Sequence, residues 1–360
     1  MKRRWALCLA IILCLMAPGC TNKNNTSYSK YSYEFIGAFD TVIQFMGYSK
    51  SQKDFEEIAQ VAQSRFMELH KLFDIYNDYE GINNIKTIND NAGIKPVEVQ
   101  QEIIDLILFA KEWYAKTNGV CNIALGPMLR IWHDYREAAS ADPDNAQIPS
   151  IYERKAAMAY TDINKVIVDA DKKTVYLEDK NMRLDVGAIA KGYASEIVAK
   201  ELEAKGVDSL IISSGGNVRT IGQPRDGIRT KWGIGIQNPD GNPLDSGDEP
   251  LDIVFLKDAS VVTSGDYQRY YMVDGRKYHH LISPITLMPA NYYRSVSIVT
   301  EDSGVADFMS TTLFLTPYEE GRALAESLGI EAIWVFPDGS IQTTEIVRGM
   351  MKNLGGASGE

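Results

Sequence analysis

Cysteine and histidine, which supply many metal, redox and nucleophilic motifs, are scarce in this sequence. The 360 residues contain four of each. No HExxH, CxxC or Walker-type phosphate loop is present, so the common zinc, dithiol and P-loop sites are excluded. Three cysteines lie within the first 20 residues, which leaves Cys121 alone in the rest of the chain. An internal disulfide is therefore excluded there, and the apolar run after Cys121 predicts a buried structural thiol.

A basic surface is lacking as well. Lys and Arg total 37 against 48 Asp and Glu, which gives a formal net charge of −11. The charge becomes −14 when the three basic residues at positions 2–4 are set aside. Such an acidic chain argues against nucleic acid as a partner.

Long apolar runs are absent except near the N-terminus. Residues 5–17 are apolar, but this segment is shorter than the ~20 residues of a membrane span. Basic residues precede it and "APGC" follows it, an order typical of a secretory signal. The order resembles a bacterial lipoprotein signal, in which the cysteine after the cleavage site is lipidated. An ordinary signal followed by a chance cysteine is the alternative.

We therefore predict three segments. Residues 1–19 are a lipoprotein signal peptide, Cys20 is the lipidated first residue of the mature chain, and residues 20–34 are a flexible polar tether. The domain then covers residues 35–353 and is held by its lipid on the extracytoplasmic face of the cell membrane. These roughly 320 residues are enough for one large domain or two subdomains.

Strand and helix patterns are mixed along this domain without regular βαβ alternation. Strands or hairpins are predicted over residues 33–48, 165–179, 207–216 and 331–336, the last of these being the final strand, with mostly strand between 230 and 300. Apolar spacing of three and four predicts helices over 52–76, 97–117, 187–205, 303–315 and 317–328. The mixture favours an α+β fold, with mixed sheets and flanking helices.

One of these helices begins in an unusual way. The stretch "MRLDVGAIAKGYASE", residues 182–196, opens it with glycines and a lysine. Helix N-termini attract anions, and glycines let backbone N–H groups approach an anion closely. A phosphate at this turn would explain Lys191 as a counter-charge, and Asp185 could cap the helix or hold a ligand. A tight turn with a solvated lysine is the alternative.

A second helix carries candidate metal ligands. The stretch "GVADFMSTTLF", residues 304–314, places Asp307 and Thr311 on one helix face, with Ser310 beside them. Carboxylate and hydroxyl oxygens are the hard ligands that Mg²⁺ takes together with substrate phosphates. The alternative is an aspartate that caps its own helix.

Three further stretches hold candidate groups. The paired histidines of "YHHLISPITLMP" (278–289) end a strand, and one of them could be a general base or a structural residue. The stretch "VVTSGDYQRYY" (261–271) forms a donor-rich turn, with Arg269 as a candidate phosphate ligand. The stretch "NIALGPMLRIWHDY" (122–135) is a Gly-Pro turn before a helix, which ordinarily indicates packing alone.

These five stretches, in this order, resemble the ApbE-like flavin transferases, the FAD:protein FMN transferase family. The matching segments are "NIALGPMLRIW", "DVGAIAKGY", "GGNVRTIG", "TSGDYQRYY", "HLISPIT" and "VADFMSTTLF", within about residues 35 to 350. The stretches "DVGAIAKGYASE" and "TSGDYQRYY" are the most specific of them. Members of the family are typically exported, which agrees with the predicted signal.

The resemblance implies a fold of two subdomains that enclose a cleft for FAD and Mg²⁺. The implied reaction attaches FMN from FAD to a Thr or Ser of a target flavoprotein through a phosphoester and releases AMP. Implied acceptors are flavoprotein subunits of membrane redox complexes or extracellular flavoproteins. His280 matches the family histidine proposed to activate the incoming hydroxyl.

The resemblance also implies ligand contacts for other residues. The metal ligands would be the Asp307 carboxylate, the Thr311 hydroxyl and the Ala188 carbonyl, with Ser310 close by. The residues expected to contact FAD are Phe39, Tyr76, Ala124, Leu125, Gly126, Asp185, Lys191, Arg269, Leu281 and Ile282.

The sequence departs from the family pattern at a few positions. The family aspartate before proline is Ser283 here, and the glycine of its T-G pair is Leu287. The D-x-[ST] pattern is replaced by Asn122 and Ala124, whereas the metal and phosphate motifs are intact. An FAD pyrophosphatase that yields FMN and AMP is one alternative to the transferase. A non-catalytic flavin-binding lipoprotein is the other.

Overall fold

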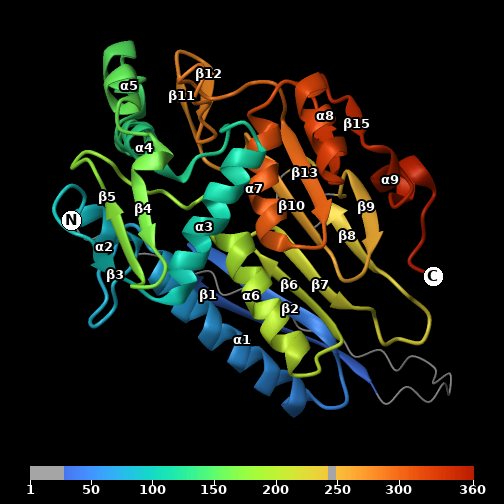
Figure 1. Cartoon of the computed structure of the whole chain (residues 1–360). Helices are drawn as coiled ribbons and strands as arrows, with labels where there is room; N and C mark the ends of the chain where they lie inside the picture. Colours follow the sequence, from blue (N-terminus) through green and yellow to red (C-terminus); the bar gives the residue numbers. More distant parts are fainter. Residues whose placement is uncertain (1–27, 242–248) are drawn as a thin grey trace, which may run out of the picture.

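The computed structural model describes residues 28–241 and 249–360, so the predicted signal peptide, Cys20 and most of the tether lie outside the described residues. Its largest feature is an antiparallel sheet of eight strands (Figure 1). In spatial order the strands are β1 (Ser29–Ala38), β2 (Thr41–Ser49), β6 (Ser209–Ser214), β7 (Asn217–Gly222), β10 (Ser260–Gly265), β13 (Ser295–Thr300), β14 (Glu331–Val335) and β15 (Ile341–Thr343).

Smaller sheets and the helices surround this sheet. The smaller sheets are β3 (Val97–Glu98) with β5 (Thr174–Leu177) and β4 (Val166–Asp169), then β8 (Trp232–Ile236) with β9 (Asp252–Leu256), and β11 (Tyr270–Val273) with β12 (Arg276–His279). The helices are α1 (Gln52–Phe73), α2 (Ile85–Asp90), α3 (Gln101–Lys116), α4 (Gly126–Ala141), α5 (Ile151–Met158), α6 (Ala190–Ala204), α7 (Ser303–Phe314), α8 (Tyr318–Leu328), α9 (Glu345–Arg348) and α10 (Lys352–Gly355).

Alternation along the central strands divides the interior into two cores. Successive side chains of a strand point to opposite faces, so Val262 and Ile298 lie in the main core with α1, α6 and α7. Their neighbours Val261 and Val299 lie in a second core with β8, β9 and the C-terminal segment. Both faces of the large sheet are therefore covered (Figure 1).

Helix α1 shows how the sequence pattern produces this packing. Its apolar residues recur at three- and four-residue spacing, and Phe55, Phe66 and Leu69 are buried against β1, β2 and α6. The Ser51 hydroxyl caps the helix by accepting the Asp54 N–H at 3.1 Å. The predicted helix over 52–76 is confirmed and ends at Phe73.

A third core lies apart from the other two, between α4, α5 and the β11–β12 hairpin, at the top of Figure 1. It contains Met128, Trp132, Tyr271 and Ile282. The chain thus forms a large sheet-based subdomain and a smaller one, which confirms the predicted α+β fold with mixed sheets and flanking helices. Among the described residues, no helix has both the length and the apolar character needed to cross a membrane.

Four element boundaries differ from the sequence predictions. The helix predicted over 97–117 begins at Gln101, because Val97 and Glu98 pair with β5 as strand β3. Strand β1 begins at Ser29, so residues 29–34 of the predicted tether pair with β2 instead of remaining free. Helix α6 begins at Ala190 rather than at 187, because a turn that Asp185 closes precedes it. The segment 331–336 is not the last strand, because the short β15 pairs with β14 beyond it.

Candidate active site

A cavity of about 510 Å³ lies between the two subdomains. Residues from the sheet tip, α1, α4, α6, α7 and the β11–β12 hairpin line it. The predicted site residues among them are Phe39, Tyr76, Leu125, Asp185, Ala188, Lys191, Arg269, His280, Leu281, Ile282, Asp307 and Thr311. The fold therefore gathers residues from both ends of the chain around one volume, of the size that ligand sites occupy.

Three predicted site residues do not line this cavity. Ala124 is fully buried in the main core. Gly126 lies against the backbone of Arg183, where a Cβ atom would overlap the carbonyl oxygen. The Ser310 hydroxyl is buried and bonds to the Asp307 carbonyl at 2.9 Å. These residues shape the wall from behind, because close packing at each of them brings the lining residues forward.

One wall of the cavity is formed where a hydrogen bond joins α6 to α7. The Gly192 N–H of α6 donates to the Asp307 carboxylate of α7 at 2.8 Å. A Cβ atom at Gly192 would overlap the Ser303 carbonyl oxygen, so glycine permits this approach. Burial raises the pKa of Asp307, while the Lys191 charge and the Gly192 N–H act in the opposite direction. A cation bound to this buried carboxylate would offset the cost of burying its negative charge.

Hydroxyl groups surround this carboxylate. The Ser264 hydroxyl of β10 lies 2.8 Å from the Ser310 hydroxyl and 3.4 Å from that of Thr311. Among the described residues, no three His, Cys, Asp or Glu side chains form a metal cluster. A cation here would therefore bind Asp307, hydroxyl and carbonyl oxygens, and substrate phosphates. This set fits Mg²⁺, which commonly takes only one or two carboxylates beside phosphate oxygens.

The turn before α6 has a different construction from the one we predicted. The Asp185 carboxylate accepts the Gly187 N–H at 2.9 Å, so it closes the turn and does not cap α6. The N-cap position, Ile189, offers no side-chain bond to the helix. Two N–H groups of this first turn are already bonded, that of Ala190 to the Val186 carbonyl at 2.9 Å and that of Gly192 to Asp307, so the turn offers an anion mainly the Lys191 side chain and the positive end of the helix dipole. Burial also raises the pKa of Asp185, against the opposing effects of the Gly187 N–H and nearby Arg183.

The two neighbouring histidines have different surroundings. His279 is buried, with Nε2 2.6 Å from the Ala290 carbonyl and Nδ1 accepting the Leu281 N–H at 3.2 Å. His280 lines the cavity, and its Nδ1 has no protein partner. Burial and the adjacent Arg269 charge lower the pKa of His280 to about 3, so its imidazole is neutral near pH 7. Of these two histidines, His280 is the one with a ring nitrogen that has no protein partner.

Several residues of this second wall were not predicted. Trp132 Nε1 and the Tyr271 hydroxyl are buried without a protein partner, and both residues line the cavity. Arg136, which also lines it, approaches His133 Nδ1 at 2.8 Å. Spacing in "RIWHDYR" offered a signal, because Trp132 and Arg136 lie one helical turn apart. The sequence pattern marked Trp132 and Tyr271 only as packing residues. It did not indicate that their polar atoms would lack a hydrogen-bond partner.

Asn217 was also missed, at the start of β7 after the two glycines of "GGN". It is buried, lines the cavity, and has an Nδ2 group without a partner. The segment "GGNVRTIG" matched the family, but Asn217 was given no role in the site. The two glycines have positive φ values in the structure and turn the chain at this point. Asn217 thus offers a fixed donor toward the cavity.

Two aromatic residues that line the cavity, Phe39 and Tyr76, are held through their backbone. The β1–β2 turn consists of Phe39 and Asp40, with φ values of 54° and 51° that favour Gly or Asn. The Phe39 N–H donates to His70 Nδ1 at 3.2 Å, which holds this turn. The Asp74 carboxylate accepts the Tyr76 N–H at 2.6 Å and fixes the backbone of that residue. These contacts orient two aromatic residues without side-chain bonds of their own.

The loop that departs from the family pattern keeps its turn by other means. The Ser283 hydroxyl accepts the Ile285 and Thr286 N–H groups at 3.2 and 3.3 Å, as a shorter replacement for a carboxylate. Leu287 has a φ of 60°, a conformation that glycine adopts more readily. The departure therefore changes side chains in this loop and retains its local bonding.

Comparison with known proteins identifies the family. The model of the ApbE family matches residues 39–334. The FAD:protein FMN transferase of Treponema pallidum (strain Nichols) is 33% identical over 274 residues, which cover 72% of this chain and 72% of the relative. That of Klebsiella pneumoniae (strain 342) is 33% identical over 277 residues, covering 76% and 81%.

Solved structures show the same architecture. The ApbE protein of Thermotoga maritima matches with a TM-score of 0.77 and 28% identity, covering 89% of this chain and 99% of its own. The flavin transferase ApbE of Vibrio cholerae matches with a TM-score of 0.71 at 21% identity, covering 88% and 97%. This second likeness supports the fold alone.

Proposed function

This chain belongs to the ApbE family and is an FAD:protein FMN transferase, and we propose the following reaction for it. The enzyme joins the FMN part of FAD to a Thr or Ser hydroxyl of a target flavoprotein and releases AMP. The reaction uses Mg²⁺ bound at Asp307. The observation that supports this most is the shared cavity of Lys191, Asp307 and His280. Phosphoryl transfer needs charge neutralisation, positioning and an activated nucleophile, and these three residues offer one each.

Substrate phosphates bind beside the first turn of α6. The Lys191 ammonium and the positive end of the helix dipole neutralise the pyrophosphate of FAD there. Asp307, Thr311 and the Ala188 carbonyl are the residues that would hold Mg²⁺, which when bound supplies polarisation of a phosphoryl oxygen. Asp307 keeps its position because the Gly192 N–H holds one carboxylate oxygen.

His280 serves as the general base. Its neutral imidazole takes the proton of the acceptor hydroxyl, whose oxygen then bonds to the FMN phosphorus. The bond from that phosphorus to the bridging oxygen breaks, and AMP leaves with this oxygen. Burial is the main cause of the low pKa of His280 and the Arg269 charge is the second. A substrate phosphate beside Arg269 would offset that second cause and raise the pKa of His280.

An acceptor-dependent assay tests the proposal against hydrolysis. Purified protein is incubated with FAD and Mg²⁺, either alone, with a Thr-containing peptide from a flavoprotein, or with the matching Val peptide. We expect AMP and covalent peptide flavin in equal amounts with the Thr peptide only. AMP and free FMN at equal rates in all three mixtures would identify a pyrophosphatase instead.

The location of the enzyme is a separate proposal, supported by the order of basic, apolar and small residues before Cys20. Lipidation of Cys20 holds the domain on the extracytoplasmic face of the membrane, where exported flavoproteins or membrane redox subunits are its acceptors. A Cys20→Ser variant is expected in the soluble extracytoplasmic fraction after fractionation. Retention of this variant in the membrane pellet would contradict lipid anchoring at Cys20.

A further inference from the structure

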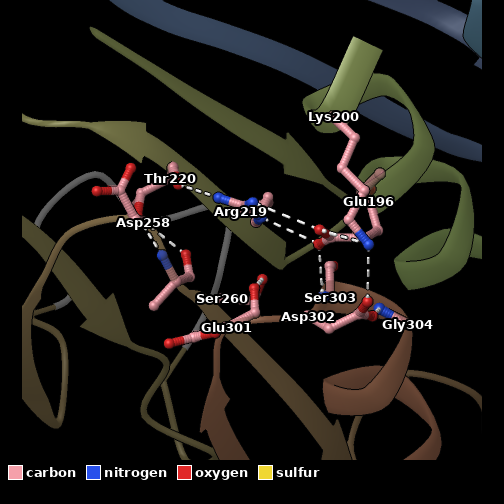
Figure 2. A network of polar contacts seen from close by, with 12 residues as sticks. Glu196, Lys200, Arg219, Thr220, Asp258, Ser260, Glu301, Asp302, Ser303 and Gly304 are labelled. Atoms are coloured by element: carbon pink, nitrogen blue, oxygen red, sulfur yellow. Dashed lines mark hydrogen bonds and ion pairs between the residues drawn. The ribbon is translucent and has the colours of Figure 1, made fainter. Parts of the chain in front are cut away.

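A buried ion pair lies behind the α6–α7 wall, outside the cavity. Glu196 of α6 and Arg219 of β7 are each 5% exposed, and the Arg219 Nε donates to the Glu196 carboxylate at 3.0 Å (Figure 2). Arg219 also pairs with Glu203, which lies two turns further along α6, at 3.0 Å. The arginine therefore has two carboxylate partners, and only one of them is Glu196.

Glu196 has a second contact that Glu203 lacks. Its carboxylate accepts the N–H of Ser303, the first residue of α7, at 2.8 Å. The next N–H groups of this helix turn, at Gly304 and Val305, donate to the Asp302 carboxylate at 2.8 and 3.1 Å. Figure 2 shows both carboxylates at this helix start, with the Lys200 ammonium 3.4 Å from Glu196 and 3.2 Å from Asp302. Two carboxylates thus satisfy the free N–H groups of α7, and one of them belongs to α6.

The Glu196 contact is paired with a second one a helical turn away. Gly192 and Asp307 bond four residues before Glu196 and four residues after Ser303. The earlier residue of α6 thus bonds to the later residue of α7, and the later residue of α6 to the earlier one of α7. This is the pattern expected for neighbouring antiparallel helices. Two bonds one helical turn apart restrict both the translation and the rotation of α7 relative to α6. A single bond would still allow α7 to rotate about the bonded residue.

We infer that Glu196 is a positioning residue for the cation and phosphate site. By holding the Ser303 N–H it keeps Asp307 and Thr311 in register with Lys191 on α6. The inference rests on the metal site of the proposed function. A buried ion pair adds little net stability, because desolvation opposes the charge attraction. The bond to a second helix gives Glu196 a role that the ion pair alone does not explain.

Direct metal binding tests this role without the transfer reaction. Mn²⁺ is titrated into the FAD-free protein, and the free ion is followed by electron paramagnetic resonance. We expect Glu196→Ala to weaken Mn²⁺ binding ~10-fold or more, as loss of a residue behind a metal site commonly does. Ser303→Pro removes the same N–H at a helix position that favours proline, and we expect a similar loss. FAD binding in EDTA, measured by flavin fluorescence, should change much less.

Two controls separate positioning from simple ion pairing. Glu196→Gln keeps an oxygen for the Ser303 N–H and should retain most of the Mn²⁺ affinity. Glu203→Gln removes a partner of the same arginine without touching α7, and should leave the affinity unchanged. Equal losses in Glu203→Gln and Glu196→Ala, or wild-type affinity in folded Glu196→Ala or Ser303→Pro, would overturn the inference. A wild-type protein that binds no Mn²⁺ would contradict the proposed metal site itself, and the inference with it.

Discussion

The two walls of the cavity satisfy their polar groups in different ways. On the α6–α7 wall, Asp307 bonds to Gly192, and the Ser264 and Ser310 hydroxyls bond to each other. On the wall of α4 and the β11–β12 hairpin, Trp132 Nε1, the Tyr271 hydroxyl and His280 Nδ1 are buried without a protein partner. Asn217 Nδ2 and the Ser303 hydroxyl, beside the first wall, also lack a partner. The first wall nevertheless has its carboxylate and two of its hydroxyls bonded within the protein, whereas three polar groups of the second wall have no protein partner.

This difference separates two tasks. A site that neutralises charge works best when its groups are fixed before the substrate arrives, since no reorganisation is then required during the reaction. Free donors and acceptors contribute binding energy and discrimination when a ligand supplies the missing partners. We therefore expect the first wall to govern the metal and phosphate steps. The second wall governs recognition of FAD and the proton transfer at His280.

The largest expected effect concerns the base on the second wall. His280→Ala should keep FAD binding and slow saturated FMN transfer by ~10²–10⁴-fold, the usual contribution of a general base. FAD affinity is measured by fluorescence, and transfer by covalent flavin on an acceptor peptide. His279→Ala is the matched control. It loses two backbone bonds, so it should lower thermal stability and affect the transfer rate far less. Wild-type turnover in His280→Ala would remove this residue from the mechanism.

The charge on the first wall comes next. Asp307→Asn keeps an acceptor for the Gly192 N–H but removes the negative charge, so Mg²⁺ affinity should fall and transfer slow by about 10²–10³-fold. A Mg²⁺ titration of the transfer rate measures both effects. Asp307→Ala should be at least as slow, and excess EDTA should stop the wild-type reaction. Full activity in EDTA would show that the carboxylate has a purely structural role.

A third prediction concerns how the transfer rate depends on pH through two residues of the second wall. Arg269 is the second cause, after burial, of the low pKa of His280, so Arg269→Gln should raise that pKa from about 3. Only neutral imidazole accepts a proton, so the acid limb of the transfer rate should move to higher pH. The pH profile of kcat/KM, which reports the groups of the free enzyme, measures this shift. Arg130→Gln removes an equal charge from the exposed side of α4 and should leave the limb in place. An unmoved limb in Arg269→Gln would contradict the assignment.

The smallest expected effect tests the altered loop. Ser283→Ala removes the acceptor of two N–H groups and should lower the free energy of unfolding by about 1 kcal/mol. Urea denaturation measures this change. Ser283→Asp, which restores the family residue, keeps the acceptor and should retain the loop. If Ser283→Ala unfolds like the wild type, the hydroxyl does not hold the turn.

Local patterns in the sequence predicted much of the fold. Helix α1 and the β4–β5 hairpin were predictable because their apolar periodicity arises within a few residues. The start of α6 was predicted three residues early, because the Asp185 bond to Gly187 depends on backbone geometry rather than residue type. The short β15 was missed because it owes its structure to pairing with β14 and has little pattern of its own.

The site was predictable only where a motif carried it. Lys191, Asp307 and Thr311 stand in recognisable stretches, and all three line the cavity. The free donors of Trp132 and Tyr271 were not predictable, since an unmet hydrogen bond depends on which neighbours arrive from distant segments. Glu196 was likewise hidden on a helix face that sequence periodicity assigns to packing.

The bond between Gly192 and Asp307 also has a consequence for the order of folding. It joins residues 115 positions apart, so a long loop must close before either helix meets its partner. A chain that ends before α7 lacks Asp307 and Thr311, the side chains proposed to hold the cation. We therefore expect metal-dependent transfer to be among the last properties that this polypeptide acquires during synthesis.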